Sequence, residues 1–303
     1  MKETLYKIIY HPEVNKFLRA SLKPFAPILP HQLMLPPNGI LSIKSRGDKS
    51  LRIKANQTSH LAKLLYWEGY ENFEYTTIFQ KLAKKVKVFY DIGANIGYYS
   101  LLAAFENPDI SAVGFEPASG PLHYFRENVR LNGFHNIQVE DLALSEKSGE
   151  ITFYEIRNKK YRYLEHNLAG ESNAGSKTTK LNFVPTPVKT ITFNEYVATR
   201  DVKSIDLVKM DTEGTEYKIL EHADLILSQM RPIVICETLY NTIEPELEAI
   251  FKKFGYFFYN HTTSGLEKVD TIIRDTDNGV RNCFFVPPER FSLIAEFVTN
   301  QTS

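Results

Sequence analysis

The clearest chemical signal in the sequence is the segment Asp91-Ile92-Gly93-Ala94-Asn95-Ile96-Gly97, which follows an apolar run and precedes a helical pattern. Glycine lets the backbone approach a ligand where a Cβ would clash, so Gly93 and Gly97 suit a binding loop. Asn95 tolerates a positive φ and can bond its own backbone. The N-terminus of the following helix offers N–H groups to a carboxylate, and Asp91 suits an ammonium group. The segment therefore predicts a site for a charged amino-acid tail.

Two other interpretations of this segment stay open. A dinucleotide-binding loop usually reads G-x-G-x-x-G, but Asn95 stands where the second glycine would be. Asp91 at the entrance would also oppose a pyrophosphate. The other interpretation is a tight turn between a strand and a helix that binds no ligand.

Acidic residues also follow the next two apolar runs. Glu116 ends the run that begins at Ile110, and Asp141 follows a short run around Ile137. A carboxylate at the position of Glu116 can accept two hydrogen bonds from a ribose diol, as it also does in NAD sites. Asp141 either meets an adenine amino group or is a solvated turn residue.

Two later apolar runs end in Asp211 and Glu237, and Glu213 follows the first of them closely. Together with Asp91 and Glu116, carboxylates end four such runs. Ligands on open α/β sheets bind outside the carboxyl ends of the strands. We therefore expect these acids to gather at one rim of a sheet.

The elements that carry these residues alternate between apolar strands and helices. This rhythm is typical of βαβ units and predicts a Rossmann-like, doubly wound, mostly parallel sheet covered on both faces. We expect residues 61–303 to form this α/β domain and residues 1–60 to form a small N-terminal appendage. Seven strands are expected, at residues 86–90, 110–115, 137–139, 205–210, 233–236, 256–259 and 282–286.

Residues 151–193 interrupt the alternation. Ile151–Tyr154 and Val188–Phe193 read as the two strands of a hairpin, and a polar stretch that includes residues 170–176 lies between them. Long loops of this kind are often lids. The stretch is therefore either a substrate-facing lid or a plain surface excursion.

Composition limits the class of protein. The 303 residues contain 36 basic and 36 acidic side chains, so the net charge of zero gives no attraction to nucleic acid or to an acidic membrane. Cys236 and Cys283 lie in apolar runs and read as buried thiols, which suits a reducing compartment. The N-terminus lacks the uninterrupted apolar stretch of a signal peptide or a membrane span. We therefore expect a cytoplasmic protein.

The motifs resemble those of a known family. Asp91-x-Gly93-x-Asn95-x-Gly97 and Gly114-Phe115-Glu116-Pro117 are similar to the class I S-adenosylmethionine-dependent methyltransferases. The resemblance narrows to the FkbM family of these enzymes through three stretches: Ala143-Leu144-Ser145 with Gly149-Glu150-Ile151, residues 205–216, and residues 282–287. It runs from about Glu68 to Pro287, and Lys209-x-Asp211-x-Glu213-Gly214-x-Glu216 is its most specific part. The chain departs from the family at Thr192-Phe193-Asn194, where a Leu-Asp pair is usual after the threonine.

The resemblance implies a class I methyltransferase fold, S-adenosylmethionine as cofactor, and methyl transfer to a hydroxyl of a polyketide, sugar or related metabolite. A small-molecule or glycan hydroxyl is the expected acceptor, and its identity stays open, as does the oligomeric state. The expected cofactor-binding residues are Asp91, Gly93, Asn95, Gly97, Glu116, Pro117 and Asp141.

Transfer to a hydroxyl is assisted by a base that takes the hydroxyl proton, a contribution of roughly 10²–10⁴-fold. Asp211 is the first candidate, and Glu213 and Glu237 are the others. The alternative is that Asp211 caps a helix beginning near Gly214. Asp211 and Glu213 could also share a magnesium ion, but no third ligand stands at a fixed spacing, so no metal is predicted.

The sequence disfavours three rival functions. A nicotinamide-dependent oxidoreductase is disfavoured by Asn95 and by the Asp211 and Glu213 stretch. A nucleic-acid adenine methyltransferase needs an Asp/Asn-Pro-Pro-aromatic segment. The two Pro-Pro pairs of the chain have neither the required flanking residues nor the required position. A non-catalytic cofactor-binding module is disfavoured by the intact acids at several strand ends.

Overall fold

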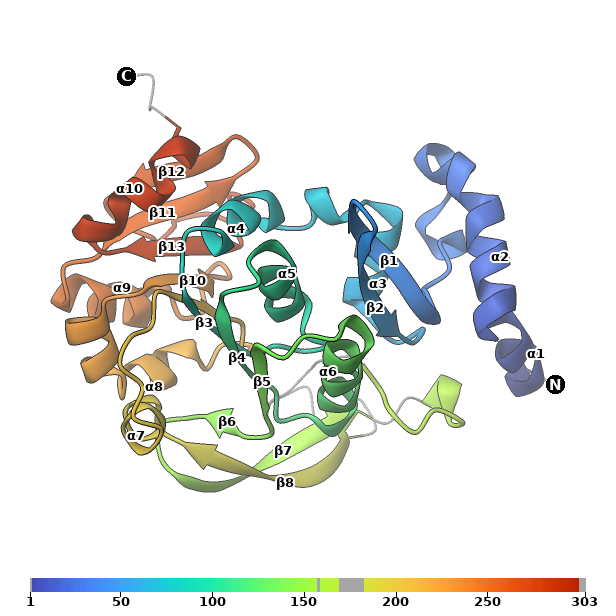
Figure 1. The fold of residues 1–303 in the computed structure, drawn as a ribbon, viewed down its shortest axis with the longest axis horizontal. Coiled ribbons are helices and arrows are strands. Elements are labelled where there is room, and N and C mark those ends of the chain that lie inside the picture. Colours follow the sequence, from blue (N-terminus) through green and yellow to red (C-terminus); the bar gives the residue numbers. More distant parts are fainter. Residues whose placement is uncertain (1, 157–158, 169–182, 300–303) are drawn as a thin grey trace.

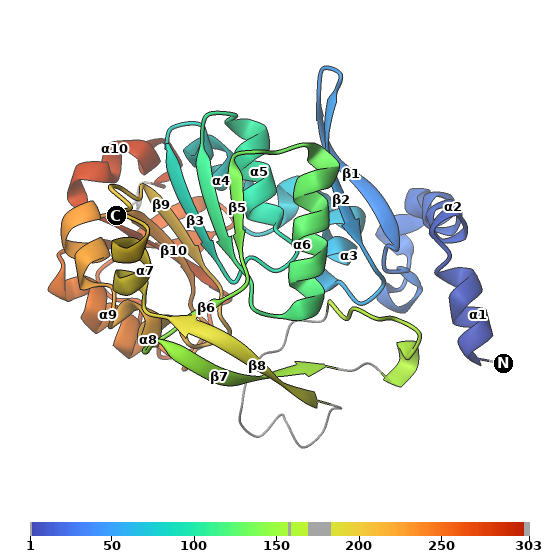
Figure 2. The same ribbon diagram turned by 60° about the horizontal axis from the view of Figure 1, so that its bottom comes forward.

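A mixed sheet forms the centre of the protein. The computed structural model of the chain describes residues 2–156, 159–168 and 183–299. Within this part an eight-stranded sheet has the order β12-β11-β13-β10-β9-β3-β4-β5 (Figures 1 and 2). Its strands are β3 (Val88–Ile92), β4 (Ser111–Phe115), β5 (Ile137–Glu140), β9 (Leu207–Met210), β10 (Ile233–Glu237), β11 (Phe257–Thr262), β12 (Gly265–Val269) and β13 (Asn282–Val286).

The five strands from β10 to β5 run parallel. β13 pairs antiparallel with β10, and β11 pairs antiparallel with β13, so β11 runs in the same direction as the five. The predicted doubly wound, mostly parallel α/β sheet is thereby confirmed. The predicted number of seven strands is one too few for the described part. The additional edge strand β12 pairs antiparallel with β11. Glu267 and Lys268 interrupt its apolar character, so no apolar run marks it in the sequence.

Helices cover both faces of the sheet because successive strand residues point to opposite sides. Phe89, Leu207 and Ile235 belong to one hydrophobic core, and their neighbours Tyr90, Val208 and Val234 belong to the other. The first face carries α4 (Thr76–Ala83), α5 (Tyr98–Glu106) and α6 (Ser119–Asn132), and the second carries α7 (Phe193–Thr199), α8 (Glu216–Leu220) and α9 (Glu244–Lys253). A short helix, α10 (Phe291–Ile294), follows the last strand.

Helix ends follow local sequence signals. Gly133 adopts a left-handed conformation and ends α6, with Phe134 N donating to the Val129 carbonyl at 3.2 Å. The Thr192 side chain accepts from Glu195 N and starts α7.

The N-terminal region contains α1 (Lys2–Ile9), α2 (Pro12–Leu22), the hairpin β1 (Gly39–Arg46) and β2 (Lys49–Ala55), and α3 (His60–Trp67). The hairpin turns at Gly47-Asp48, and Asn38-Gly39 leads into β1. Leu51 and Ile53 share a core with α5, so this hairpin packs on the α/β domain. The domain boundary at residue 60 stays a prediction.

A second, three-stranded sheet crosses the carboxyl ends of the main strands (Figure 2). It consists of β6 (Ala143–Leu144), β8 (Phe183–Ile191) and β7 (Gly149–Ile156), in that order. The predicted hairpin between residues 151 and 193 is confirmed by the antiparallel pairing of β7 with β8. The proposed lid, with Gly170, Ser172, Asn173, Gly175 and Ser176, lies outside the described residues.

Candidate functional site

A cavity of about 940 Å³ lies at the carboxyl ends of β3, β4 and β9. The loops that follow these strands form part of its wall, and residues 142–146, β7 and residues between 161 and 167 form further parts. Of the predicted site residues, the cavity wall includes Gly93, Asn95, Glu116, Pro117, Asp211 and Glu213. Asp91, Gly97, Asp141 and Glu237 are not on this wall.

The loop after β3 has the predicted conformation at Asn95, and its two glycines lie close to other parts of the chain. Asn95 has φ +52°, and its side-chain oxygen accepts from the backbone N–H of Ile96 at 2.8 Å. A Cβ on Gly93 would lie 1.9 Å from the backbone oxygen of Asp211, and one on Gly97 would lie 2.1 Å from the Phe125 ring. Packing against other parts of the chain therefore requires glycine at both positions. The clearance for a ligand that the sequence suggested stays a prediction.

Glu116 faces this loop from the end of β4. Its carboxylate accepts hydrogen bonds from Asn95 N at 2.7 Å and from Ala118 N at 2.8 Å, one on each oxygen. Burial raises the pKa of Glu116 to about 7, although the two N–H donors oppose the shift. Each carboxylate oxygen accepts more than one hydrogen bond, so Glu116 retains acceptor capacity toward the cavity.

Asp91 lies beneath the loop and is fully buried. Its Oδ2 accepts from the N–H and the hydroxyl of Ser100, at 3.1 and 2.8 Å. Its Oδ1 lies 3.6 Å from the Lys209 ammonium. The nearest cation to Asp91 is thus part of the protein, and the predicted contact with a ligand ammonium stays a prediction.

Lys209 is a site residue that sequence reasoning did not single out as such. Its Nζ donates to the Gly93 carbonyl at 2.9 Å and lies 3.6 Å from Asp211 Oδ2. Burial lowers the pKa of Lys209, but the carboxylates of Asp211 and Asp91 outweigh burial and raise it above its ordinary value. The spacing of Lys209 and Asp211 could have predicted their proximity, because residues two apart on a strand point to the same side.

Glu74 is a second residue that the sequence analysis missed. It precedes α4 with a φ of +42°, which is uncommon for a non-glycine residue. The Tyr99 hydroxyl donates to Glu74 Oε2 at 2.8 Å. Burial raises the pKa of Glu74, and the charges of Lys209 and Asp211 also act on it. No motif in the sequence connects Glu74 with the later strand ends.

The three predicted catalytic acids occupy different places. Asp211 follows β9 on the cavity wall with a 43% exposed side chain, and Glu213 lies on the same wall at φ +58°. Glu237 ends β10 away from this wall, and burial together with Asp211 and Glu213 raises its pKa to about 8. Asp211 does not cap α8, which begins at Glu216 without a side-chain cap.

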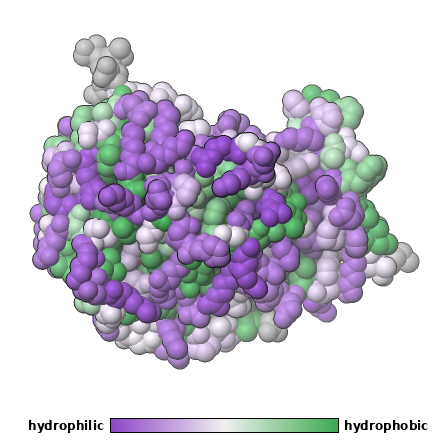
Figure 3. All heavy atoms as spheres, in the orientation of Figure 1, coloured by the Kyte–Doolittle hydropathy of each residue, from purple (hydrophilic) through white to green (hydrophobic). Residues whose placement is uncertain are grey.

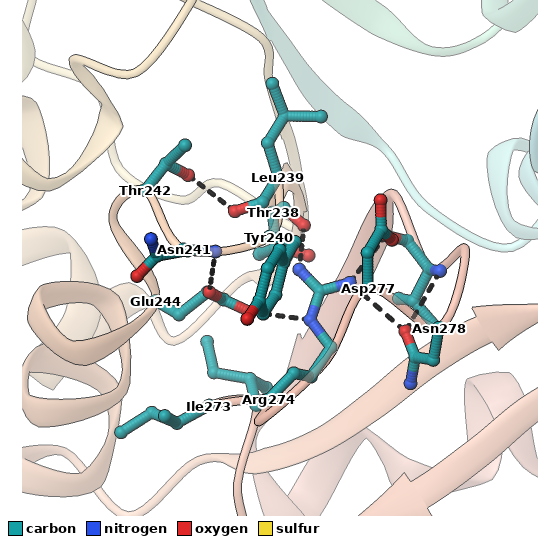
Figure 4. A network of polar contacts seen from close by, with 12 residues as sticks. Thr238, Leu239, Tyr240, Asn241, Thr242, Glu244, Ile273, Arg274, Asp277 and Asn278 are labelled. Carbon is teal, nitrogen blue, oxygen red and sulfur yellow. Dashed lines mark hydrogen bonds and ion pairs between the residues drawn. The ribbon is translucent and has the colours of Figure 1, made fainter.

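The loop after Glu237 is fixed by a network around Arg274, whose side chain is 7% exposed (Figure 4). Arg274 donates to Glu244 Oε1 at 2.6 Å and to the carbonyl oxygens of Thr238 and Val280 at 2.5 and 2.6 Å. Glu244 Oε2 in turn accepts from Asn241 N at 2.6 Å. This network holds the backbone that begins directly after Glu237.

Asp141 lies in the connection between β5 and β6. Its carboxylate lies 3.0 Å from Arg126 Nη2, and its side chain is 62% exposed. The apolar residues that follow it, Leu142, Ala143 and Leu144, line the cavity instead. Asp141 is thus solvated and lies off the cavity wall, and its predicted contact with adenine stays a prediction.

The described residues contain no group of three or more His, Cys, Asp or Glu side chains arranged to hold a metal ion. Nor does any helix in residues 2–156, 159–168 and 183–299 have the length and apolar character needed to cross a membrane.

An open, doubly wound sheet with a cavity at the carboxyl ends of its parallel strands is the arrangement in which α/β proteins bind nucleotide-like cofactors. The family model of the FkbM methyltransferase domain matches residues 91–258, more than half of the 303 residues. The chain belongs to the FkbM methyltransferase family, as its motifs suggested.

Among curated proteins, the 31-O-demethyl-FK506 methyltransferase FkbM of Streptomyces tacrolimicus is 27% identical over 154 residues, 44% of this chain and 58% of that protein. Methyltransferase sdnD of Sordaria araneosa is 26% identical over 55% of this chain and 72% of its own length. The chain thus spans less than two thirds of the first relative. A solved FkbM methyltransferase from Methylobacillus flagellatus KT is similar with 14% identity and a TM-score of 0.43, over 66% of this chain and 43% of that one.

Proposed function

We propose that the protein binds S-adenosylmethionine in this cavity and transfers its methyl group to a hydroxyl oxygen of a small molecule, a glycan or a polyketide-like metabolite. The observation that carries the proposal is the position of Glu116. Glu116 follows β4 on the cavity wall, and its carboxylate accepts a hydrogen bond from the N–H of Asn95 in the glycine loop. A carboxylate at this point of an α/β sheet suits a ribose diol.

The cavity residues fit such a cofactor. Ligand sites typically enclose about 300–1,000 Å³, and the 940 Å³ of this cavity lies at the upper end of that range. Leu142 and Leu144 offer apolar contact to a base, and Asp211 and Glu213 offer negative charge to a cationic ligand. S-adenosylmethionine, when bound, supplies a methyl group on a sulfonium sulfur, and the thioether that remains after transfer is the leaving group.

The chain's own contribution is to orient the acceptor and to remove its proton. Asp211 is our candidate for the base because it lines the cavity and its carboxylate forms an ion pair with Lys209. Proton removal of this kind contributes roughly 10²–10⁴-fold to a rate. We assign Glu213, on the same wall, to acceptor orientation, and we assign Glu237, which lies off the wall, no contact with the acceptor.

The proposal also covers the class of acceptor and the location of the enzyme in the cell. A nucleic-acid acceptor is not proposed, because the net charge of zero supplies no general attraction to phosphates. Cys236 and Cys283 are both free and buried. Free thiols suit a reducing compartment, and we infer a cytoplasmic enzyme from them.

Thermal unfolding with added ligands tests the cofactor. S-adenosylmethionine and S-adenosylhomocysteine at about 100 times their Kd should stabilise the fold by about 2.7 kcal/mol and raise Tm by several degrees. NAD should leave Tm unchanged, and selective stabilisation by NAD would overturn the proposal.

Labelled methyl transfer, followed by mass spectrometry over candidate acceptors, tests the reaction. Asp211→Asn should keep the ligand-induced rise in Tm and lose turnover by roughly 10²-fold or more. Full activity of Asp211→Asn would show that Asp211 is not the base. A matched control is Asp141→Asn, whose carboxylate lies off the cavity wall and should be dispensable.

A further inference from the structure

The N-terminal helices expose an unusual share of the protein's apolar side chains. Of the twelve large hydrophobic side chains that are exposed among the described residues, seven fall between residues 5 and 33. They are Leu5, Ile8, Val14, Phe17, Phe25, Ile28 and Leu33, and exposure reaches 71% for Phe17 and 82% for Ile28. Large exposed apolar surfaces of this kind mark interaction sites.

The packing of α2 is inverted with respect to an ordinary surface helix. It exposes Val14 and Phe17, which are three residues apart and share a side. It buries Asn15 and Arg19, which are joined by a 2.8 Å hydrogen bond from Arg19 Nε to Asn15 Oδ1. Asn15 also accepts from Asn38 N at 2.8 Å. The polar side of α2 is thus used to attach it to the domain, which leaves its apolar side for an external partner.

The segment that follows α2 also exposes apolar side chains. Phe25 and Ile28 lie in the 3-10 helix η1 (Lys23–Ile28), which contains Pro24 and Pro27. Both apolar side chains are more than half exposed. This end of the molecule projects from the sheet beyond the hairpin of β1 and β2 (Figure 1), and Figure 3 shows hydrophobic residues on its outer side.

The charge of the segment indicates which partner it suits. Residues 1–38 contain five basic side chains, at Lys2, Lys7, Lys16, Arg19 and Lys23, and two acidic ones, at Glu3 and Glu13. Because Arg19 is buried, the remaining four lysines and two glutamates give the segment a charge of +2 outside that guanidinium. Two copies of a positively charged segment repel each other, whereas anionic lipid attracts it. Apolar and aromatic side chains beside lysines are typical of helices that lie in a membrane interface.

We propose that α1, α2 and η1 form a docking surface for an anionic lipid membrane, on which the protein lies peripherally. The apolar side chains enter the interfacial layer, and the lysines remain among the lipid headgroups.

The docking surface is connected with the cavity. Tyr6 on α1 and Tyr10, which follows it, both pack edge-on against Tyr161, with ring centroids 5.6 Å apart. Tyr161 itself lines the cavity. If the proposed function holds, the surface brings the cavity close to an acceptor hydroxyl carried by a membrane lipid, and this step alone rests on that function.

Sedimentation with vesicles tests the surface. The probes are vesicles of phosphatidylcholine and vesicles in which about a third of the lipid is phosphatidylglycerol. The full chain should sediment with the anionic vesicles, less so at high salt, and weakly with the neutral ones. Phe17→Ser with Ile28→Ser should lower the partition coefficient at least about tenfold. The matched control is Phe257→Ser with Ile273→Ser, which removes exposed apolar side chains elsewhere and should bind as the wild type does.

Three outcomes would overturn the proposal. The first is wild-type protein that ignores anionic vesicles, and the second is equal binding by the Phe17→Ser, Ile28→Ser variant. The third is a wild-type dimer in solution that this variant converts to a monomer, with no vesicle binding by either, which would assign the surface to a second copy. Failure of the proposed function is seen separately, as a missing rise in Tm with S-adenosylmethionine while vesicle binding persists.

Discussion

At the scale of single residues, the site is organised around a buried ammonium. Lys209 is 5% exposed and lies between Asp91, Asp211 and the carbonyl of Gly93. A buried charge is tolerated only when it is paired and hydrogen-bonded. Lys209 therefore joins β9 to the glycine loop and fixes the carboxylate of the proposed base.

Removal of this ammonium should be costly. Lys209→Met leaves the fully buried Asp91 without its counter-charge, and breaking a buried pair typically costs about 3–5 kcal/mol of unfolding free energy. Asp91→Asn should offset part of this loss, so the double variant should be more stable than the sum of the single changes predicts. Denaturant unfolding of the four proteins measures the coupling, and strictly additive effects would refute it.

Glu116 should determine cofactor affinity. Glu116→Gln retains the shape but loses the charge, and hydrogen bonds to charged groups are worth about 1.5–3 kcal/mol, so S-adenosylmethionine should bind about 10–100-fold more weakly. Titration calorimetry measures the change. The control is Glu140→Gln, a buried glutamate at the end of the neighbouring strand β5 that does not line the cavity. Equal losses in both variants would argue against a ribose contact at Glu116.

At the scale of elements, the glycine loop is shaped by the helices and strands around it. Gly97 lies against Phe125 of α6, and Gly93 lies against the backbone that leaves β9. These contacts set the distance between the first parallel strand and the elements on either side. A ligand then meets a loop whose conformation the fold has already fixed.

A substitution at Gly97 separates packing from backbone strain. Gly97→Ala places a methyl group on the Phe125 ring at φ +86°, so overpacking of about 1–3 kcal/mol adds to left-handed strain of about 1–2 kcal/mol. Gly133→Ala has a φ of +66° and meets nothing within 4 Å, so it should incur the strain alone. Denaturant midpoints compare the two variants. Equal losses would mean that α6 yields to the added methyl group.

At the scale of the whole molecule, the acids at the sheet rim make stability depend on pH. Glu116 and Glu237 have pKa values of about 7 and about 8, above their ordinary value of 4.5. The folded protein therefore holds protons that the unfolded chain has released. Their contribution to stability is fully present below about pH 4.5 and is lost as the pH rises through 7 and 8.

The double variant Glu116→Gln, Glu237→Gln should show a smaller loss of unfolding free energy between about pH 5 and about pH 8.5 than the wild type. Urea unfolding across this range gives the comparison. Burial lowers the pKa of His261, which acts in the opposite sense below about pH 6.5, so the difference between the two proteins isolates the carboxylates. Parallel curves for both proteins would contradict the assigned shifts.

The sequence by itself determined the layers of the fold and the rim where the site lies. Apolar runs such as those ending at Glu116 and Asp211 define buried parallel strands, and their end residues must meet at one edge. This local information suffices because polarity and period are properties of each element alone. It also identified the family, through motifs that cluster at those strand ends.

Only the tertiary structure decided which of these residues meet. Gly93 accepts from Lys209, 116 residues away, and its missing Cβ makes room for Asp211. Glu74 joins the same cluster, whereas Glu237 and Asp141 lie off the cavity wall that β7 helps to form. The physical reason is that a contact depends on how elements distant in sequence pack, and the pattern within an element records its buried side but not its neighbour.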